Sequence, residues 1–152
     1  MVRKAKTRDV PQIHALLSEF SSQGALLSRP LSRLYDNIRD FFVFVSDSDD
    51  SMVIGCCALQ VCWEDLAEIR SLAVRSDWWG KGVGTALVKH ALADAVDLEI
   101  REVFALTYVV PFFEKHGFVK TDRSNLPLKI WADCIECVKF PDCDETAMIK
   151  KL

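Results

Sequence analysis

The stretch from residue 68 to residue 92, EIRSLAVRSDWWGKGVGTALVKHAL, constrains the fold of this chain more than any other segment. It begins with an apolar run of strand length, Glu68 to Val74. A polar break and three glycines at alternate positions, Gly80, Gly82 and Gly84, come next, and apolar residues then recur at helical spacing. The stretch therefore predicts a strand, a glycine-containing loop and a helix in direct succession.

Glycines at alternate positions leave main-chain N–H groups open to a ligand, because no Cβ covers them. The first N–H groups of a helix have no partner inside the helix, and the helix dipole favours an anion there. Such a loop can therefore hold a diphosphate. The alternative is a tight turn that packs a helix on a sheet, and the glycine spacing by itself fits both. The segment is not a Walker loop, and its glycine spacing differs from the dinucleotide fingerprint.

Two motifs resemble those of the GNAT N-acetyltransferases. The segments Leu72–Val74 and Trp79–Gly84 are similar to the strand and the Arg/Gln-x-x-Gly-x-Gly/Ala signature that bind acetyl-CoA in that family. The segment Phe112–Phe118 is similar to the family's Phe-Tyr-x-Lys-x-Gly-Phe. Trp79 stands where the family has Arg or Gln, which removes a side-chain donor, and Phe113 replaces the usual tyrosine. The resemblance covers nearly the whole chain.

At 152 residues the chain has the length of one domain. The resemblance implies a single acetyltransferase domain over 1–152 with an α/β (α+β) GNAT fold. Its central sheet would be mixed and mostly antiparallel, splayed between strands 4 and 5, with helices on both faces. The pattern along the chain predicts a helix with Pro11 in its first turn after a cap at Thr7 or Asp9, a short helix with Leu34 and Ile38 inward, and a solvated turn over 47–51. It also predicts a short helix over 109–116 ended by Gly117, and strands over 2–6, 42–46, 52–63, 66–74, 103–106, 118–121 and 147–151.

Acetyl transfer to an amine needs a polarised thioester carbonyl and a base that removes a proton from the amine. The resemblance implies that main-chain N–H groups near Leu72 and Val74 pair with the pantetheine arm as an added strand would. It also makes Glu68 the candidate base, with Glu64 and Asp65 as substitutes. The alternative for Glu68 is a surface carboxylate at a strand edge.

The departing thiolate can be protonated by a nearby donor. Tyr108 and Ser71 are the candidates, because Phe113 has no proton to donate. Tyr108 could equally be a packing aromatic, and a CoA thiolate could leave without a dedicated acid. The resemblance places acetyl-CoA as the co-substrate, with contacts at Leu72, Ala73, Val74, Trp79, Gly80, Lys81, Gly82, Val83, Gly84 and Thr85.

A closer resemblance concerns the acceptor. The segment EIRSLAV is similar to the Glu-Ile-x-x-Leu-Ala-Val strand of the N-acetylglutamate synthases, and 26–29 and 126–129 are similar to their Leu-Leu-Pro-Arg and Leu-Pro-x-Lys segments. This implies acetylation of the α-amino group of L-glutamate, for arginine biosynthesis, with Arg29 and Lys129 receiving the carboxylates. Without the resemblance both cations would be ordinary solvated residues. Alternatives are another small amine, a protein N-terminus, or an acetyl-CoA sensor without catalysis.

The charge and the apolar pattern of the chain limit the kinds of partner that it can bind. The net charge is −3 with no basic run, which argues against nucleic-acid binding. No apolar run reaches the ~18 residues of a membrane span, and the first residues lack an apolar signal core. The sequence therefore predicts a cytoplasmic protein, and the resemblance implies a small-molecule amino-acid substrate as its partner. Dimers are common in the family, and Trp78 with Trp79, expected to be exposed, could serve a second copy or the cofactor.

The six cysteines fall into two groups. Cys56, Cys57 and Cys62 lie in a predicted strand, where buried thiols pack as small hydrophobes. The group Cys134-x2-Cys137-x5-Cys143 supplies only three thiols, and a closed zinc site needs four ligands. Reduced thiols are the favoured interpretation and no metal is expected. The alternatives are a disulfide, uncommon in a reducing cytosol, and a zinc site completed by His116, Asp142 or Asp144.

Overall fold

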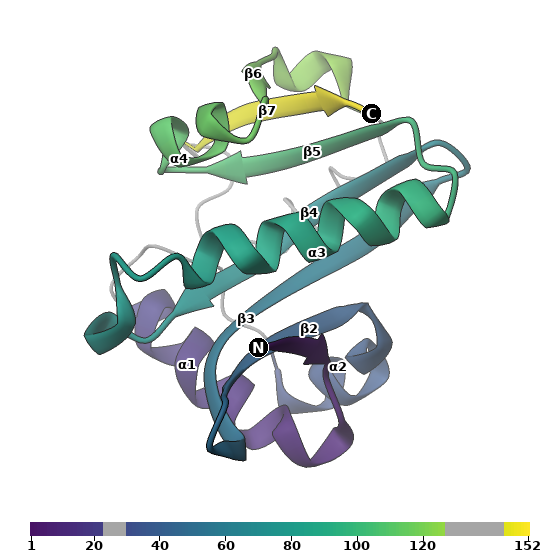
Figure 1. Ribbon diagram of the computed structural model, residues 1–152. Coiled ribbons are helices and arrows are strands. Elements are labelled where there is room, and N and C mark those ends of the chain that lie inside the picture. The colour runs from purple at the N-terminus through teal and green to yellow at the C-terminus, as the bar shows by residue number, and fades with distance from the viewer. Residues whose placement is uncertain (23–29, 127–144) are drawn as a thin grey trace. The chain divides into compact units, whose positions relative to one another are not determined.

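The computed structural model describes residues 1–22, 30–126 and 145–152. Its strands form one seven-stranded sheet in the order β1-β2-β3-β4-β5-β7-β6 (Figure 1). The strands are β1 (Val2–Lys4), β2 (Phe41–Ser46), β3 (Asp49–Trp63), β4 (Leu66–Val74), β5 (Glu102–Thr107), β6 (Val119–Lys120) and β7 (Thr146–Lys151). Within the described residues, the α-helices are α1 (Val10–Ser22), α2 (Leu31–Asp36), α3 (Val83–Asp97) and α4 (Val110–Lys115).

The chain forms two compact units. The first unit comprises Met1–Gln60 and Ile69–Asp94, and the second comprises Val61–Glu68 and Ala95–Leu152. Each is described by itself below.

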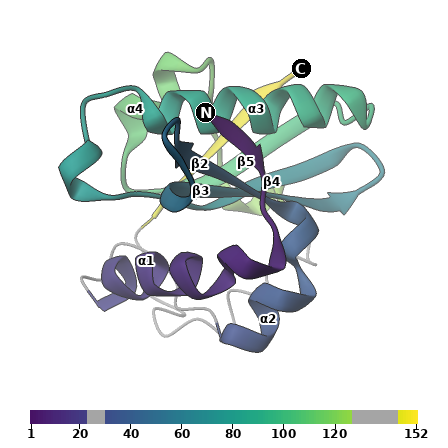
Figure 2. The same cartoon turned by 60° about the horizontal axis from the view of Figure 1, so that its bottom comes forward.

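In the first unit, β2 pairs antiparallel with both β1 and β3. Figure 2 shows α1 and α2 on one face of these strands and α3 on the other, as the resemblance implied. Alternate residues of β2 point to the α1 side, because side chains alternate along a strand. They join a cluster of buried residues that includes Val10, Ile13, Leu16, Leu17, Leu34, Phe41, Val43, Val45, Val53, Cys56, Ala58 and Ala73.

In the second unit, β7 pairs antiparallel with β5 along its whole length and with β6 (Figure 1). The parallel pairing of β4 with β5 covers only three residue pairs, from Leu66 with Glu102 to Glu68 with Phe104. A splayed sheet is expected to pair in this way. The unit has its own buried cluster of Cys62, Leu66, Phe104, Leu126 and Ala147.

Most predicted elements are confirmed within two residues, and β4 has the predicted bounds. Gly117, which follows α4, has a φ of +87°, as expected for a residue that ends a helix in the left-handed conformation. The second helix is shorter than expected, since α2 ends at Asp36 and Ile38 lies in a separate 3-10 turn. No helix in the described ranges has both the length and the apolar character needed to cross a membrane.

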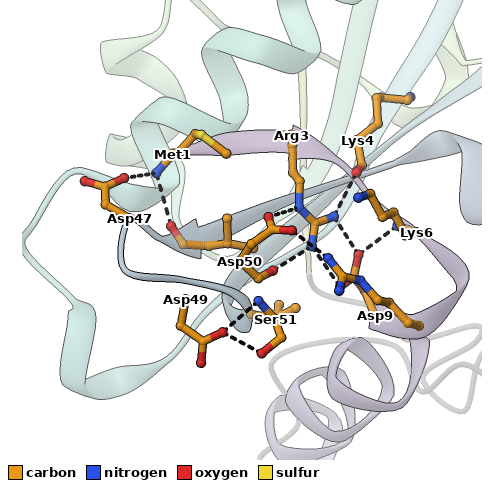
Figure 3. Close-up of polar contacts among 12 residues, drawn as sticks. Met1, Arg3, Lys4, Lys6, Asp9, Asp47, Asp49, Asp50 and Ser51 are labelled. Carbon is orange, nitrogen blue, oxygen red and sulfur yellow. Dashed lines mark hydrogen bonds and ion pairs between the residues drawn. The ribbon is translucent and has the colours of Figure 1, made fainter.

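An ionic cluster ties the N-terminal segment to the turn between β2 and β3 (Figure 3). The Arg3 guanidinium donates to both oxygens of Asp9, at 2.8 and 3.0 Å, and to Asp50 at 2.7 Å. Arg8 donates to the second oxygen of Asp50 at 2.6 Å. The Lys6 N–H donates to Asp9 at 2.7 Å, which closes a 3-10 turn before α1. Asp9 is only 1% exposed, so this carboxylate bonds to the protein and is shielded from solvent.

The predicted solvated turn at 47–51 is confirmed, since these residues are exposed, but Asp50 also bonds to Arg3 and Arg8, which the sequence did not predict. Asp49 and Asp47 are exposed, as predicted. The sequence could not show the bonds of Asp50, because its partners lie 47 and 42 positions away.

Candidate functional site

The glycine loop, residues 75–82, connects β4 to α3 in the first unit. Gly80 and Gly82 have φ of +78° and +80°. A Cβ built on either glycine would meet no atom of the described residues within 4 Å. Among those residues, glycine is thus required by the left-handed backbone and not by crowding. A ligand can therefore approach the loop at both positions without meeting any of the described residues.

The start of α3 supplies the second half of an anion site. Its helical hydrogen bonding begins with the Ala86 N–H, which donates to Gly82 O at 3.0 Å. The N–H groups before it have no helical carbonyl available, and the dipole of this 15-residue helix favours negative charge there. The loop and helix start therefore have the geometry that a diphosphate requires.

The two tryptophans of the loop have different surroundings, which corrects the expectation of an exposed pair. Trp79 is 60% exposed. Trp78 is half-buried, with its ring centroid 6.5 Å from that of Phe44. The Lys81 ammonium lies 4.8 Å from the centroid of the Trp78 ring, at cation–π distance.

Trp79 carries an indole N–H where the family has the donor of Arg or Gln, and this N–H bonds within the chain. Its indole Nε1 donates to Val74 O at 2.8 Å. Its ring stacks on Phe20 of α1, with centroids 6.2 Å apart and planes 27° apart. The sequence shows that tryptophan carries an N–H, but the partner is set by the path of the loop.

Glu68 is 8% exposed and pairs with Phe104 in the parallel ladder. The alternative of a surface carboxylate at a strand edge is therefore wrong. Glu64 and Asp65 are exposed in the turn before β4. The Asp65 carbonyl accepts N–H groups of Arg101 and Glu102, at 3.1 and 3.0 Å, and so fixes this turn to the start of β5.

Ser71 interrupts the regular backbone of β4 with a φ of +55°. A non-glycine residue in this conformation is strained, and such strain is concentrated at functional sites. The Ser71 carbonyl accepts the thiol of Cys56 at 3.3 Å. Leu72 and Val74 are half-buried, whereas Ala73 is buried in the cluster that contains α1 residues.

Tyr108 and Phe113 have opposite surroundings. Tyr108 is 41% exposed, which does not favour a purely packing role. Phe113 is 3% exposed, and its ring meets those of Phe112 and Phe118 edge-on at 5.2 Å. The phenylalanine that replaces the family's tyrosine is therefore a core residue.

The first unit thus contains Ser71, the segment Leu72–Val74 and the glycine loop. Glu68 and Tyr108 belong to the second unit. Arg29 and Lys129 lie outside the described residues, as do Cys134, Cys137 and Cys143.

The structure adds a pocket in the first unit that was not predicted. Two arginines, Arg33 of α2 and Arg70 of β4, line it. The Arg70 guanidinium donates to the Gln60 side chain, which orients it. Asp40 also lines the pocket. Burial raises the pKa of its carboxyl group, although the positive charge of Lys4 opposes this shift. The remaining lining residues are Leu34, Asn37, Phe41, Ala58, Gln60 and Ser71. The one available sequence signal was Arg70, two positions after Glu68 on the same strand.

The thiols in β3 behave as the sequence predicts. Cys56, Cys57 and Cys62 are buried, and no disulfide joins cysteines in the part of the chain that the structure describes. Burial raises the pKa of Cys56 to about 12 and also raises that of Cys57, so neither is a thiolate at neutral pH. Within residues 1–22, 30–126 and 145–152 there is no group of three or more His, Cys, Asp or Glu side chains that could hold a metal ion.

The mixed sheet, with its short parallel pairing of β4 and β5, and the glycine loop at a helix start are typical of an enzyme class that takes its acyl group from a CoA thioester. The model of the Acetyltransferase (GNAT) family matches residues 10–118. The chain belongs to this family, and it is an acetyl-CoA-dependent N-acetyltransferase.

Several known proteins are similar over most of the chain. An uncharacterised N-acetyltransferase of Chlorobaculum tepidum is 39% identical over 151 residues, covering 99% of this chain and 96% of that protein. An amino-acid acetyltransferase of Mycobacterium tuberculosis is 37% identical over 131 residues, covering 86% of this chain and 75% of that protein.

Among solved structures, the N-acetylglutamate synthase of Neisseria gonorrhoeae, complexed with coenzyme A and N-acetyl-glutamate, matches with a TM-score of 0.89 and 27% identity. The match covers 100% of this chain and 35% of that enzyme. The chain therefore spans about a third of the synthase.

Proposed function

We propose that this acetyltransferase transfers the acetyl group of acetyl-CoA to the α-amino group of L-glutamate, and so supplies N-acetylglutamate for arginine biosynthesis. The observation that carries the proposal is the similarity to the gonococcal synthase, which extends over the whole chain and whose structure holds N-acetyl-glutamate with coenzyme A. The similarity to amino-acid acetyltransferases supports the same acceptor class.

The donor binds through main-chain groups in this proposal. Amides of Leu72 and Val74, on either side of the buried Ala73, pair with the pantetheine arm and polarise the thioester carbonyl. The N–H groups of Gly80–Gly84 and of Thr85 in α3 hold the diphosphate, because no atom of the described residues lies where a Cβ on Gly80 or Gly82 would stand. The Lys81 ammonium adds a positive charge to the same loop.

Glu68 removes one proton from the ammonium group of glutamate, either directly or through a water molecule. The freed amine then attacks the thioester carbonyl, the C–N bond forms, and collapse of the tetrahedral intermediate breaks the C–S bond. The pair of electrons leaves with the CoA thiolate, which takes a proton from Tyr108 or Ser71. The attacking nitrogen loses its second proton as the amide forms, and this proton restores the donor. The burial of Glu68 supports the role, because a base shielded from bulk water acts on the bound amine and not on solvent.

The acceptor's two carboxylates need cations. Arg29 and Lys129 fill this role in the proposal, on the similarity of their segments to those of the synthases. The pocket in the first unit offers two more guanidinium groups, Arg33 and Arg70. A guanidinium binds a carboxylate through two parallel hydrogen bonds, so an arginine already oriented by Gln60 loses little freedom when it does so.

An acceptor screen tests the proposal. The protein is incubated with acetyl-CoA and each of the twenty amino acids, and release of the CoA thiol is followed. We expect turnover with L-glutamate well above that with the other amino acids. Turnover with another amine and none with glutamate would overturn the acceptor while leaving the acetyltransferase assignment intact.

A variant pair then tests the pocket. Arg70→Gln is expected to raise the KM for glutamate by roughly tenfold or more, because a charge-assisted bond to a carboxylate is lost, and to leave the KM for acetyl-CoA unchanged. Arg39→Gln, a change at an exposed arginine in the turn after α2, is the matched control and should leave both values unchanged.

A further inference from the structure

The tryptophan that replaces Arg or Gln in the signature is joined to the strand before the loop. The indole N–H of Trp79 donates to the carbonyl of Val74, the last residue of β4, at 2.8 Å. Trp79 also directly precedes Gly80, the first glycine with positive φ. One side-chain hydrogen bond therefore fixes the distance between the end of β4 and Gly80, the first glycine of the glycine loop.

Other contacts hold the rest of the segment before the glycines. The Arg75 N–H donates to Ile54 O at 2.9 Å, which ties the loop to β3. The Arg75 guanidinium donates to both oxygens of Asp77, at 3.2 and 2.9 Å. The N–H groups of Trp78 and Trp79 close a short 3-10 turn on Arg75 and Ser76. The loop is therefore hydrogen-bonded up to Trp79, and the glycines with positive φ begin directly after this residue.

The ring of Trp79 has a second attachment, the stacking on Phe20 in the last turns of α1. The indole thus joins three elements of the first unit: β4 through its N–H, α1 through its ring and the glycine loop through its own backbone. Beyond Trp79, a Cβ on Gly80 or Gly82 would meet no atom of the residues that the structure describes within 4 Å. Trp79 thus has both a side-chain hydrogen bond and a stacking partner, and it directly precedes the first glycine of the loop.

We propose that Trp79 is a positioning residue for acetyl-CoA: its indole sets the conformation in which the amides from Gly80 to Gly84 receive the diphosphate. The residue acts through the backbone and makes no bond to the cofactor. The loop is then pre-organised before the cofactor arrives, and less ordering entropy is lost on binding. The inference rests on the acetyl-CoA-dependent activity of the family and is independent of glutamate as the acceptor.

Three variants separate the two attachments. Trp79→Phe keeps a ring for stacking and removes the N–H. Phe20→Leu keeps the N–H bond and removes the stacking partner. Trp63→Phe changes another exposed tryptophan, 67% exposed on β3, and is the matched control. The primary measurement is the Kd of acetyl-CoA by calorimetry, which requires no acceptor.

We expect Trp79→Phe to raise the Kd of acetyl-CoA about fivefold, the effect of one neutral hydrogen bond. Phe20→Leu should raise it about threefold, the effect of one aromatic pair, and Trp63→Phe should leave it unchanged. With any acceptor that is turned over, Trp79→Phe should raise the KM for acetyl-CoA while kcat at saturating acetyl-CoA and the acceptor's KM stay within about twofold.

An unchanged Kd in a folded Trp79→Phe protein would overturn the proposal, as would an equal fall in kcat and in acetyl-CoA affinity. If Trp79→Phe does not fold, an unchanged Kd in Phe20→Leu overturns it instead. Failure of glutamate in the acceptor screen affects none of the Kd values, so the two proposals fail separately.

Discussion

Glu68 offers the most direct test of the proposed chemistry at the scale of single residues. Its side chain is a buried carboxylate, while its two alternatives, Glu64 and Asp65, are exposed. Glu68→Gln keeps the shape and removes the base. We expect kcat to fall by roughly 10²–10⁴-fold, the usual contribution of a positioned base, with the Kd of acetyl-CoA unchanged. Steady-state kinetics over a pH series check this, and the variant should be rescued partly at high pH, where the free amine is more abundant.

The two alternatives provide the comparison. Glu64→Gln and Asp65→Asn should retain kcat, because solvated carboxylates in a turn are not shielded from water. A larger fall in kcat for either of them than for Glu68→Gln would mean that the base is not Glu68.

At the scale of elements, the glycine loop is the part that links the fold to cofactor binding. Gly82 has a φ of +80°, which alanine adopts at a cost of about 1–2 kcal/mol. In Gly82→Ala the free loop relaxes to another conformation, and acetyl-CoA must restore the original one. We therefore expect its Kd, measured by calorimetry, to rise about tenfold.

Gly117→Ala is the matched control for this change. Gly117 also has a positive φ, +87°, but it follows α4 in the second unit. A Cβ there would also clash with the Lys150 ammonium. The variant should lose stability and keep its Kd for acetyl-CoA. Equal effects of both glycine variants on Kd would contradict a specific role of the loop.

The elements could be predicted wherever the apolar pattern is continuous. β4 has the predicted bounds because Leu66–Val74 is a mostly apolar segment of strand length between two polar turns. Long-range side-chain contacts could not be predicted in this way. The bond from Trp79 to Val74 depends on the path of the loop, and the burial of Trp78 depends on Phe44 of β2. Cysteine burial was predictable because Cys56 and Cys57 lie inside an apolar strand.

At the scale of the whole molecule, the ionic cluster at Asp9 makes stability depend on pH. Burial disfavours the charged carboxylate, but the bonds from Arg3 and the Lys6 N–H outweigh it, so the pKa of Asp9 is lowered. In the unfolded chain the pKa is about 3.9. The charged carboxylate therefore stabilises the fold above about pH 4, and this contribution is lost as the pH falls through the lower, folded-state value.

Asp9→Asn should lower the free energy of unfolding at pH 7 by about 3 kcal/mol, because it leaves the Arg3 charge without its buried partner. The difference between variant and wild type should shrink below about pH 4, and urea unfolding at several pH values measures it. Asp47→Asn, at an aspartate whose side chain is 92% exposed, is the control and should have little effect. A difference that is the same at every pH would contradict the assigned role of the Asp9 charge.

The central claim is that main-chain amides at the start of α3 and in the loop before it receive the diphosphate of acetyl-CoA. Titration of the ¹⁵N-labelled protein with acetyl-CoA, followed by amide chemical shifts, tests this claim most directly. We predict that the amides of Gly80, Gly82 and Gly84 move far more than that of Gly117, and that they saturate at the calorimetric Kd. If acetyl-CoA binds while the amides of these three glycines keep their chemical shifts, the glycine loop does not bind the diphosphate.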